Sequence, residues 1–124
     1  MARLFLSLGA SSAALGVALG ALGAHALRGR LEPRMLDAFE VAVRYQMYHA
    51  LALLAVAWVA GRSAGNLAPA AGWLFVAGTV LFSGSLYGLS LGGPRWLGPI
   101  TPLGGAAFIA GWLCLAVAAW RMSS

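Results

Sequence analysis

Four long apolar runs, separated by short segments that contain arginine, proline and glycine, constrain the fold of this chain most strongly. The runs cover about residues 4–27, 43–61, 70–91 and 101–120. Each is close to the roughly 20 apolar residues that a membrane-spanning helix needs. We therefore expect an all-α fold, an integral membrane four-helix bundle in which residues 1–124 form a single four-span domain.

The composition agrees with a chain that lies almost entirely in a bilayer. Hydrophobic residues make up 61% of the chain and charged residues 9%, with a mean hydropathy of +0.85. A soluble domain carries about a quarter charged residues. Four spans of about 20 residues use most of the 124 residues. This leaves no room for a soluble domain.

Prolines fall between the apolar runs or at their starts. Thr101-Pro102 is typical of an N-cap followed by proline in the first helical turn, and Glu32-Pro33 predicts a similar helix start. A helix over residues 33–61 would be about 43 Å long, which exceeds the thickness of the hydrocarbon core. We therefore predict a short interfacial helix, residues 33–44, before the second span.

The first apolar run also resembles a secretory signal. Arg3 precedes it, and Ala24-His25-Ala26 imitates a small-x-small cleavage site. A signal core has about 7 to 15 apolar residues, fewer than this run contains. We expect a retained first span.

Arginines set the expected orientation. The net charge of +5 comes from eight basic residues, all arginine, against three acidic ones. Five arginines lie in or beside the first and third loops and three lie on the opposite side, which favours both termini outside. They stand at the edges of apolar runs rather than along one face, so we expect membrane lipids as partners and no nucleic acid.

Small residues recur at intervals of four in two of the spans. They are Ser12, Gly16, Gly20 and Ala24 in the first span, and Gly84, Gly88 and Gly92 in the third. Helices associate in lipid through close packing of such residues. We expect both faces to pack on neighbouring helices of the same chain rather than on a second copy.

A polar cluster marks the start of the second span. At about 100° per residue, Glu40, Arg44 and Tyr48 share one helical face, Tyr45 and His49 flank it, and Gln46 points away. Glu40 precedes Arg44 by four residues, which favours an ion pair. With His25 near the end of the first span, the candidate functional residues are His25, Glu40, Arg44, Tyr45, Gln46, Tyr48 and His49.

The two histidines allow several functions. His25 and His49 could form a paired metal or haem site, or could bond backbone carbonyls and neighbouring side chains. Two histidines without acidic or cysteine ligands at fixed spacing are a weak metal pattern, so no metal and no cofactor is expected. An ionisable residue inside a span also raises the alternative of a transporter or channel for a small solute, proton or anion, with a polar cavity near His49.

Four sequence blocks resemble a known family. They are GALGAHAL (20–27), AVRYQMYHALALL (42–54), LFSGSLYGL (81–89) and GPITPLGGAAFIAGW (98–112). Together they resemble the small bacterial inner-membrane family of unknown function that includes YgdD and YwdK, domain of unknown function 423. The resemblance implies a four-span protein of the bacterial inner membrane and supplies no activity or catalytic residues. Matching glycines, Gly104 and Gly105 among them, are further candidates for helix packing.

The chain contains no recognisable pair of nucleophile and base, so we do not expect an enzyme. Small size and short loops favour a structural or accessory membrane component with a protein partner in a membrane complex.

Overall fold

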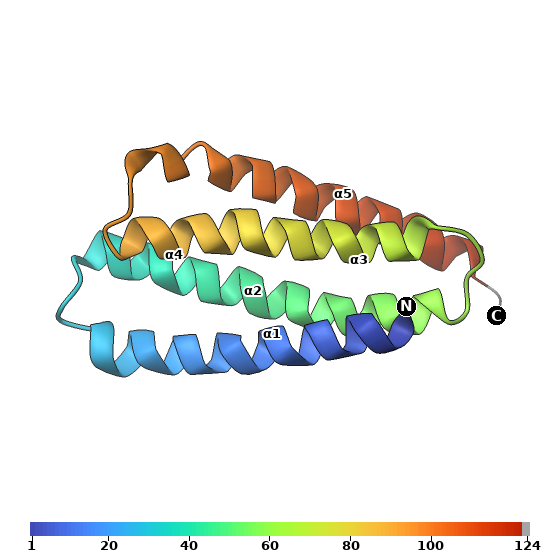
Figure 1. The fold of residues 1–124 in the computed structure, drawn as a ribbon, viewed down its shortest axis with the longest axis horizontal. Helices are drawn as coiled ribbons and strands as arrows, with labels where there is room; N and C mark the ends of the chain where they lie inside the picture. Colours follow the sequence, from blue (N-terminus) through green and yellow to red (C-terminus); the bar gives the residue numbers. More distant parts are fainter. Residues whose placement is uncertain (123–124) are drawn as a thin grey trace.

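The computed structural model describes residues 1–122 as a bundle of four helical rods joined by short loops (Figure 1). The first rod is α1 (Ala2–Leu22) with the π-helical turn η1 (Gly23–Leu27), and the second is α2 (Pro33–Ala60). The third joins α3 (Leu67–Gly78), the π-helical turn η2 (Thr79–Ser83) and α4 (Gly84–Ser90). After the 3₁₀ turn η3 (Arg95–Leu97), α5 (Ile100–Arg121) is the fourth. These residues contain no strand, which confirms the all-α four-helix bundle.

Helix starts follow the predicted prolines with one exception. α2 begins at Pro33, as predicted. α5 begins at Ile100, so Thr101 lies inside the helix and Pro99 occupies the N-cap position. The Thr101 hydroxyl makes a short hydrogen bond to the Ser85 hydroxyl of α4 instead of capping the helix. The predicted N-cap role of Thr101 is therefore wrong.

Three of the rods are long and apolar enough to cross a membrane, namely Ala2–Leu27, Leu67–Ser90 and Arg95–Arg121. α2 is not among them, because the polar residues of the stretch 44–49 lower the mean hydropathy of its apolar part and charged residues fill the turns before that stretch. Residues 33–44, for which we expected a short interfacial helix, continue into the second span without a break. The 28 residues of α2 make a helix about 42 Å long.

α2 occupies the centre of the packing. α1 packs along one side of it, α3, η2 and α4 contact it on another, and α5 packs mainly on α3 and η2. Figure 1 accordingly shows α1 and α5 as the outer rods, with the N-terminus and the end of α5 at the same end of the bundle. The largest fully buried side chains are Phe5, Phe39, Phe75, Val56 and Ser83.

Candidate functional site at His49

His49 is held by hydrogen bonds at both ring nitrogens. Its Nδ1 lies 2.7 Å from the backbone carbonyl oxygen of Tyr45, one turn earlier in α2. The Trp112 indole N–H of α5 donates to His49 Nε2 at 3.0 Å. A carbonyl only accepts and an indole only donates, so the proton of a neutral imidazole must lie on Nδ1. His49 thus joins α2 to α5 in one fixed tautomer, with neither nitrogen free for a ligand.

Aromatic rings fix the plane of the imidazole. The His49 ring stacks on Phe108 of α5, with centroids 3.6 Å apart and an interplanar angle of 7°. Phe75 of α3 packs at 5.3 Å and Tyr45 lies nearly parallel at 6.2 Å. Stacking of this kind contributes about 0.5–1.5 kcal/mol per pair beyond buried area. The ring, only 4% exposed, is therefore part of an aromatic cluster.

A pocket of about 520 Å³ opens beside this cluster and is lined by residues of α2, η2 and α5. Its lining comprises Tyr45, Tyr48, His49, Phe82, Gly105, Phe108, Ile109 and Trp112. We call it the aromatic pocket. Tyr45 and Tyr48 are 37% and 53% exposed, and their rings meet edge to face at 5.6 Å. Within residues 1–122 neither hydroxyl has a hydrogen-bond partner.

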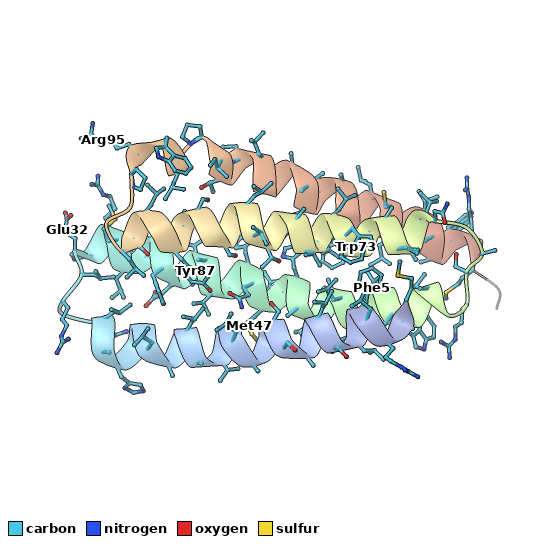
Figure 2. All side chains as sticks on the ribbon, viewed as in Figure 1. Phe5, Glu32, Met47, Trp73, Tyr87 and Arg95 are labelled. Carbon is cyan, nitrogen blue, oxygen red and sulfur yellow. The ribbon has the colours of Figure 1, made fainter. Side chains whose placement is uncertain are left out.

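The aromatic pocket lies near the middle of the bundle. His49 follows Pro33 by 16 residues and precedes Ala60 by 11, about 24 Å and 17 Å along α2. The turns before it pack inside the bundle, where Phe39 contacts Tyr87 ring to ring at 5.1 Å. Figure 2 places Glu32 at one end of the molecule and Met47 close to its middle. The polar stretch 44–49 therefore belongs to the middle of α2 rather than to its entrance.

Gln46 ties three helices together on the opposite side of α2. Its side-chain amide donates to the backbone oxygen of Ser12 in α1 at 2.9 Å. It accepts a bond of 2.6 Å from the Tyr87 hydroxyl of α4. Near it, the Ser83 hydroxyl donates to the Ala42 backbone oxygen at 2.8 Å. The sequence predicts that Gln46 points away from the helical face that carries Arg44. Gln46 is only 3% exposed, so this direction leads into the bundle.

The predicted ion pair between Glu40 and Arg44 is not formed. No nitrogen–oxygen distance between them falls within 4.0 Å. Both residues line a hollow of about 210 Å³ with Gly20 and Gly23 at the contact of α1, η1 and α2. Arg44 is exposed and Glu40 half-buried. Holding two long side chains in one geometry at an exposed position offsets most of the gain from pairing.

The structure does not bring the two histidines together. His25 is exposed in η1, beside Gly23, whose α-carbon faces the ring of Phe39. His49 lies ten residues beyond Phe39 in α2, about 15 Å further along the helix. Residues 1–122 contain no group of three or more histidine, cysteine, aspartate or glutamate side chains that could hold a metal ion.

The predicted packing glycines fall into three groups. Gly16, Gly20 and Gly104 lie against a neighbouring helix, where an added Cβ would meet Met47, Val43 and the Phe82 backbone respectively. Gly88 faces Leu97 of η3, and Gly105 lines the aromatic pocket. Gly84 was wrongly predicted as a packing position, because a Cβ there would meet nothing within 4 Å. In this rod, Ser83 and Tyr87 hydrogen-bond to α2 and so mark the side that faces α2. Gly84 points away from that side.

Sequence reasoning missed the partners of His49. Phe108 and Trp112 are four residues apart and therefore share one face of α5, as Tyr45 and His49 do in α2. That spacing was a visible signal for an aromatic face. Phe82 gave no such signal, because its position depends on the π-helical turn η2.

Comparison with known proteins finds relatives that match almost the whole chain. The family described as "Protein of unknown function (DUF423)" matches residues 19–105. The UPF0382 membrane protein YwdK of Bacillus subtilis is 50% identical over 118 residues, 94% of this chain and 96% of its own length. UPF0382 membrane proteins of Staphylococcus aureus (strain bovine RF122 / ET3-1) and Staphylococcus haemolyticus are each 46% identical, over 98% and 96% of this chain and 98% and 97% of their own lengths. No solved structure matches the chain.

Proposed function

Since the chain belongs to the DUF423 family of proteins of unknown function, we propose that it is a non-enzymatic structural or accessory component of the bacterial inner membrane. In this role it binds a protein partner within a membrane complex. Both termini face the outside of the cell membrane. The relatives are themselves named only as membrane proteins, so the proposal depends on the geometry of this chain.

One observation carries the proposal: all but one of the buried polar side chains found within residues 1–122 hold different helices together. The buried polar residues are Gln46, His49, Ser83, Ser85 and Ser90, and each makes a hydrogen bond. The first four join different helices or rods. A catalytic acid, base or nucleophile has to meet its substrate, whereas these groups are directed at the chain itself. This supports a rigid scaffold rather than a reaction centre.

A transporter or channel for a small solute, proton or anion is the second candidate. The aromatic pocket favours it, because the pocket reaches His49 near the middle of the bundle. Two features weaken it: the lining is mostly aromatic, and both His49 nitrogens are engaged. Proton and anion flux into liposomes that contain the purified protein tests this candidate. Flux abolished by His49→Phe would support a transporter, and flux equal to that of empty liposomes would dismiss it.

Native isolation tests the accessory role. We would extract the tagged chain from membranes with a styrene–maleic acid polymer and identify everything that accompanies it by native mass spectrometry. The proposal expects one protein partner at a fixed stoichiometry. A tagged Gln46→Leu variant, with its three-helix tie broken, should recover less of that partner. Repeated isolation of the chain alone, at wild-type expression, would overturn the proposal.

Cysteine labelling tests the orientation. In a Cys114→Ser background, Ala64→Cys reports on the loop near the termini and Arg30→Cys on the opposite end, both at exposed positions. With the termini outside, a membrane-impermeant maleimide should label Ala64→Cys in intact cells and Arg30→Cys only after permeabilisation. The reverse pattern would overturn the orientation.

A further inference from the structure

The aromatic pocket has a feature that the scaffold role does not use. Two of its lining residues, Tyr45 and Tyr48, carry hydroxyl groups with no hydrogen-bond partner among residues 1–122. The third polar residue of the lining, His49, is fully engaged. Unpartnered polar groups are unfavourable in hydrocarbon, and nearly all such groups in membrane proteins find a partner. The pocket thus offers two hydrogen-bond donors to a molecule from outside the chain.

The position of the pocket limits where that molecule comes from. His49 lies about 17 Å and about 24 Å from the two ends of α2, which places the pocket deep in the span. Ile109 and Trp112, on the α5 side, are 64% and 45% exposed, so the pocket opens sideways between α2 and α5. A sideways opening at this depth faces lipid. The ligand should therefore be dissolved in the bilayer rather than in water.

The walls of the pocket select a flat ring. Phe82, Phe108 and Trp112 line the pocket together with the two tyrosines, and aromatic rings favour stacked or edge-to-face contacts with another ring. A volume of about 520 Å³ falls in the range of small-molecule sites. Phe82 reaches the pocket from η2, and π-helical turns occur frequently at functional sites. An acyl chain would fill the space but would leave both hydroxyls without an acceptor.

We propose that the aromatic pocket binds a bilayer-dissolved molecule with a flat ring that bears carbonyl oxygens, the chemistry of an isoprenoid quinone headgroup. The ring stacks among Phe82, Phe108 and Trp112, and its carbonyl oxygens accept hydrogen bonds from Tyr45 and Tyr48. This inference goes beyond the scaffold role and does not depend on it, because ligand binding is measured on the isolated chain.

Titration with decylubiquinone tests the proposal. The purified full chain would be placed in nanodiscs of defined phospholipid. The quenching of its tryptophan fluorescence would be compared with the collisional quenching of free tryptophan mixed with empty nanodiscs. Trp112 lies in the pocket, so bound quinone should quench it saturably. Decylbenzene, which has a ring and the same chain length but no carbonyl oxygen, should compete at least tenfold more weakly.

Three variants locate the site. A Cβ at Gly105 would lie 3.9 Å from Phe82, so Gly105→Leu can extend into the pocket and should abolish saturable quenching. Gly84→Leu is the matched control outside the pocket, since a Cβ there meets nothing within 4 Å, and should bind as wild type does. The double variant Tyr45→Phe/Tyr48→Phe keeps both rings, and the loss of its two donors should weaken binding about tenfold or more.

Two outcomes would overturn the proposal. If decylubiquinone quenches only in proportion to its concentration, and equally in Gly84→Leu and Gly105→Leu, the pocket is not a site. If decylbenzene competes as well as decylubiquinone, or the double tyrosine variant binds normally, the occupant is an apolar chain or ring without acceptors. The double tyrosine variant still tests the proposal if Gly105→Leu fails to fold.

Discussion

The two sides of α2 are built in contrasting ways. Toward α1 the contact is made by glycines and backbone: an added Cβ at Gly9 would lie 2.7 Å from the Ala50 carbonyl oxygen, and one at Gly16 would lie 2.7 Å from Met47. Toward α5 the contact is made by large rings and one side-chain hydrogen bond, from Trp112 to His49, and a pocket of about 520 Å³ remains.

This difference shows how a small membrane bundle can be both rigid and open. Lipid provides no hydrophobic force between helices, so close backbone approach supplies much of the stabilisation. α1 and α2 are in such close contact. α5 obtains its close contacts elsewhere, where Gly104 meets the Phe82 backbone and Gly111 meets the Phe75 ring. Because α5 is held by α3 and η2, its separation from α2 can leave space for a ligand.

A larger side chain in the contact between α1 and α2 should have the largest effect on the free energy of unfolding. In Gly9→Leu the new side chain would collide with the Ala50 backbone, with Leu53 and with Leu54, which cannot all move without separating α1 from α2. We expect a loss of about 3 kcal/mol in the free energy of unfolding, at the upper end for overpacking. Thermal unfolding in detergent, followed by circular dichroism, measures the loss. Equal melting temperatures for Gly9→Leu and the control Gly84→Leu would contradict the close contact.

Removing the tie at Gln46 should have the next largest effect. Gln46→Leu leaves the Tyr87 hydroxyl and the Ser12 backbone oxygen without their partner. We expect a destabilisation of about 1–2 kcal/mol, measured by the same unfolding experiment. Adding Tyr87→Phe to Gln46→Leu removes both members of one hydrogen bond and should recover part of this loss. A double variant whose loss equals the sum of the two single losses would argue against the coupling.

On the side of α2 that faces α5, the loss of one hydrogen bond should lower the free energy of unfolding by less. Trp112→Phe removes the donor to His49 Nε2 while keeping an aromatic ring in the pocket wall. Hydrogen bonds between membrane helices contribute about 0.6 kcal/mol on average, and we expect a loss of that size. Trp120→Phe, at a position 90% exposed, is the control. If Trp112→Phe destabilises as much as Gln46→Leu, the α5 side is as rigid as the α1 side.

The smallest effect is expected at Arg44. Arg44 is exposed and makes no ion pair with Glu40. Arg44→Ala should therefore change the free energy of unfolding by less than about 0.5 kcal/mol, as is usual for surface positions. Glu40→Gln should behave in the same way. A loss above about 1 kcal/mol that disappears in the Glu40→Gln background would reveal a shielded pair after all.

Local signals in the sequence predicted the helices well. Pro33 starts α2 as expected because proline suits the first helical turn, and glycines at positive φ, such as Gly29 at 85° and Gly65 at 91°, occupy the loops. Apolar length identified the rods because the bilayer fixes that length. These features depend on a residue and its near neighbours, which the sequence displays directly.

The aromatic pocket could not be predicted in the same way. A helical wheel gave the face of His49, but not that Phe108 and Trp112 of α5 stand opposite it. Four-residue spacing singled out Gly84 without revealing that no helix faces it. Nothing in the sequence indicated the π-helical turn η2, whose wider turn alters the directions of Phe82 and Ser83. Each of these positions is decided by packing between distant segments.

The tautomer of His49 can be followed by NMR without an added probe. The chain has two histidines, and His25, exposed in η1, provides an internal reference for His49. The protonated and unprotonated nitrogens of a neutral imidazole have well-separated ¹⁵N resonances, and in His49 the proton is on Nδ1. Any event that separates α5 from α2 removes the Trp112 donor from Nε2. Histidine-selective ¹⁵N labelling would therefore report the opening of this pocket, in native lipid, as a shift in a single resonance.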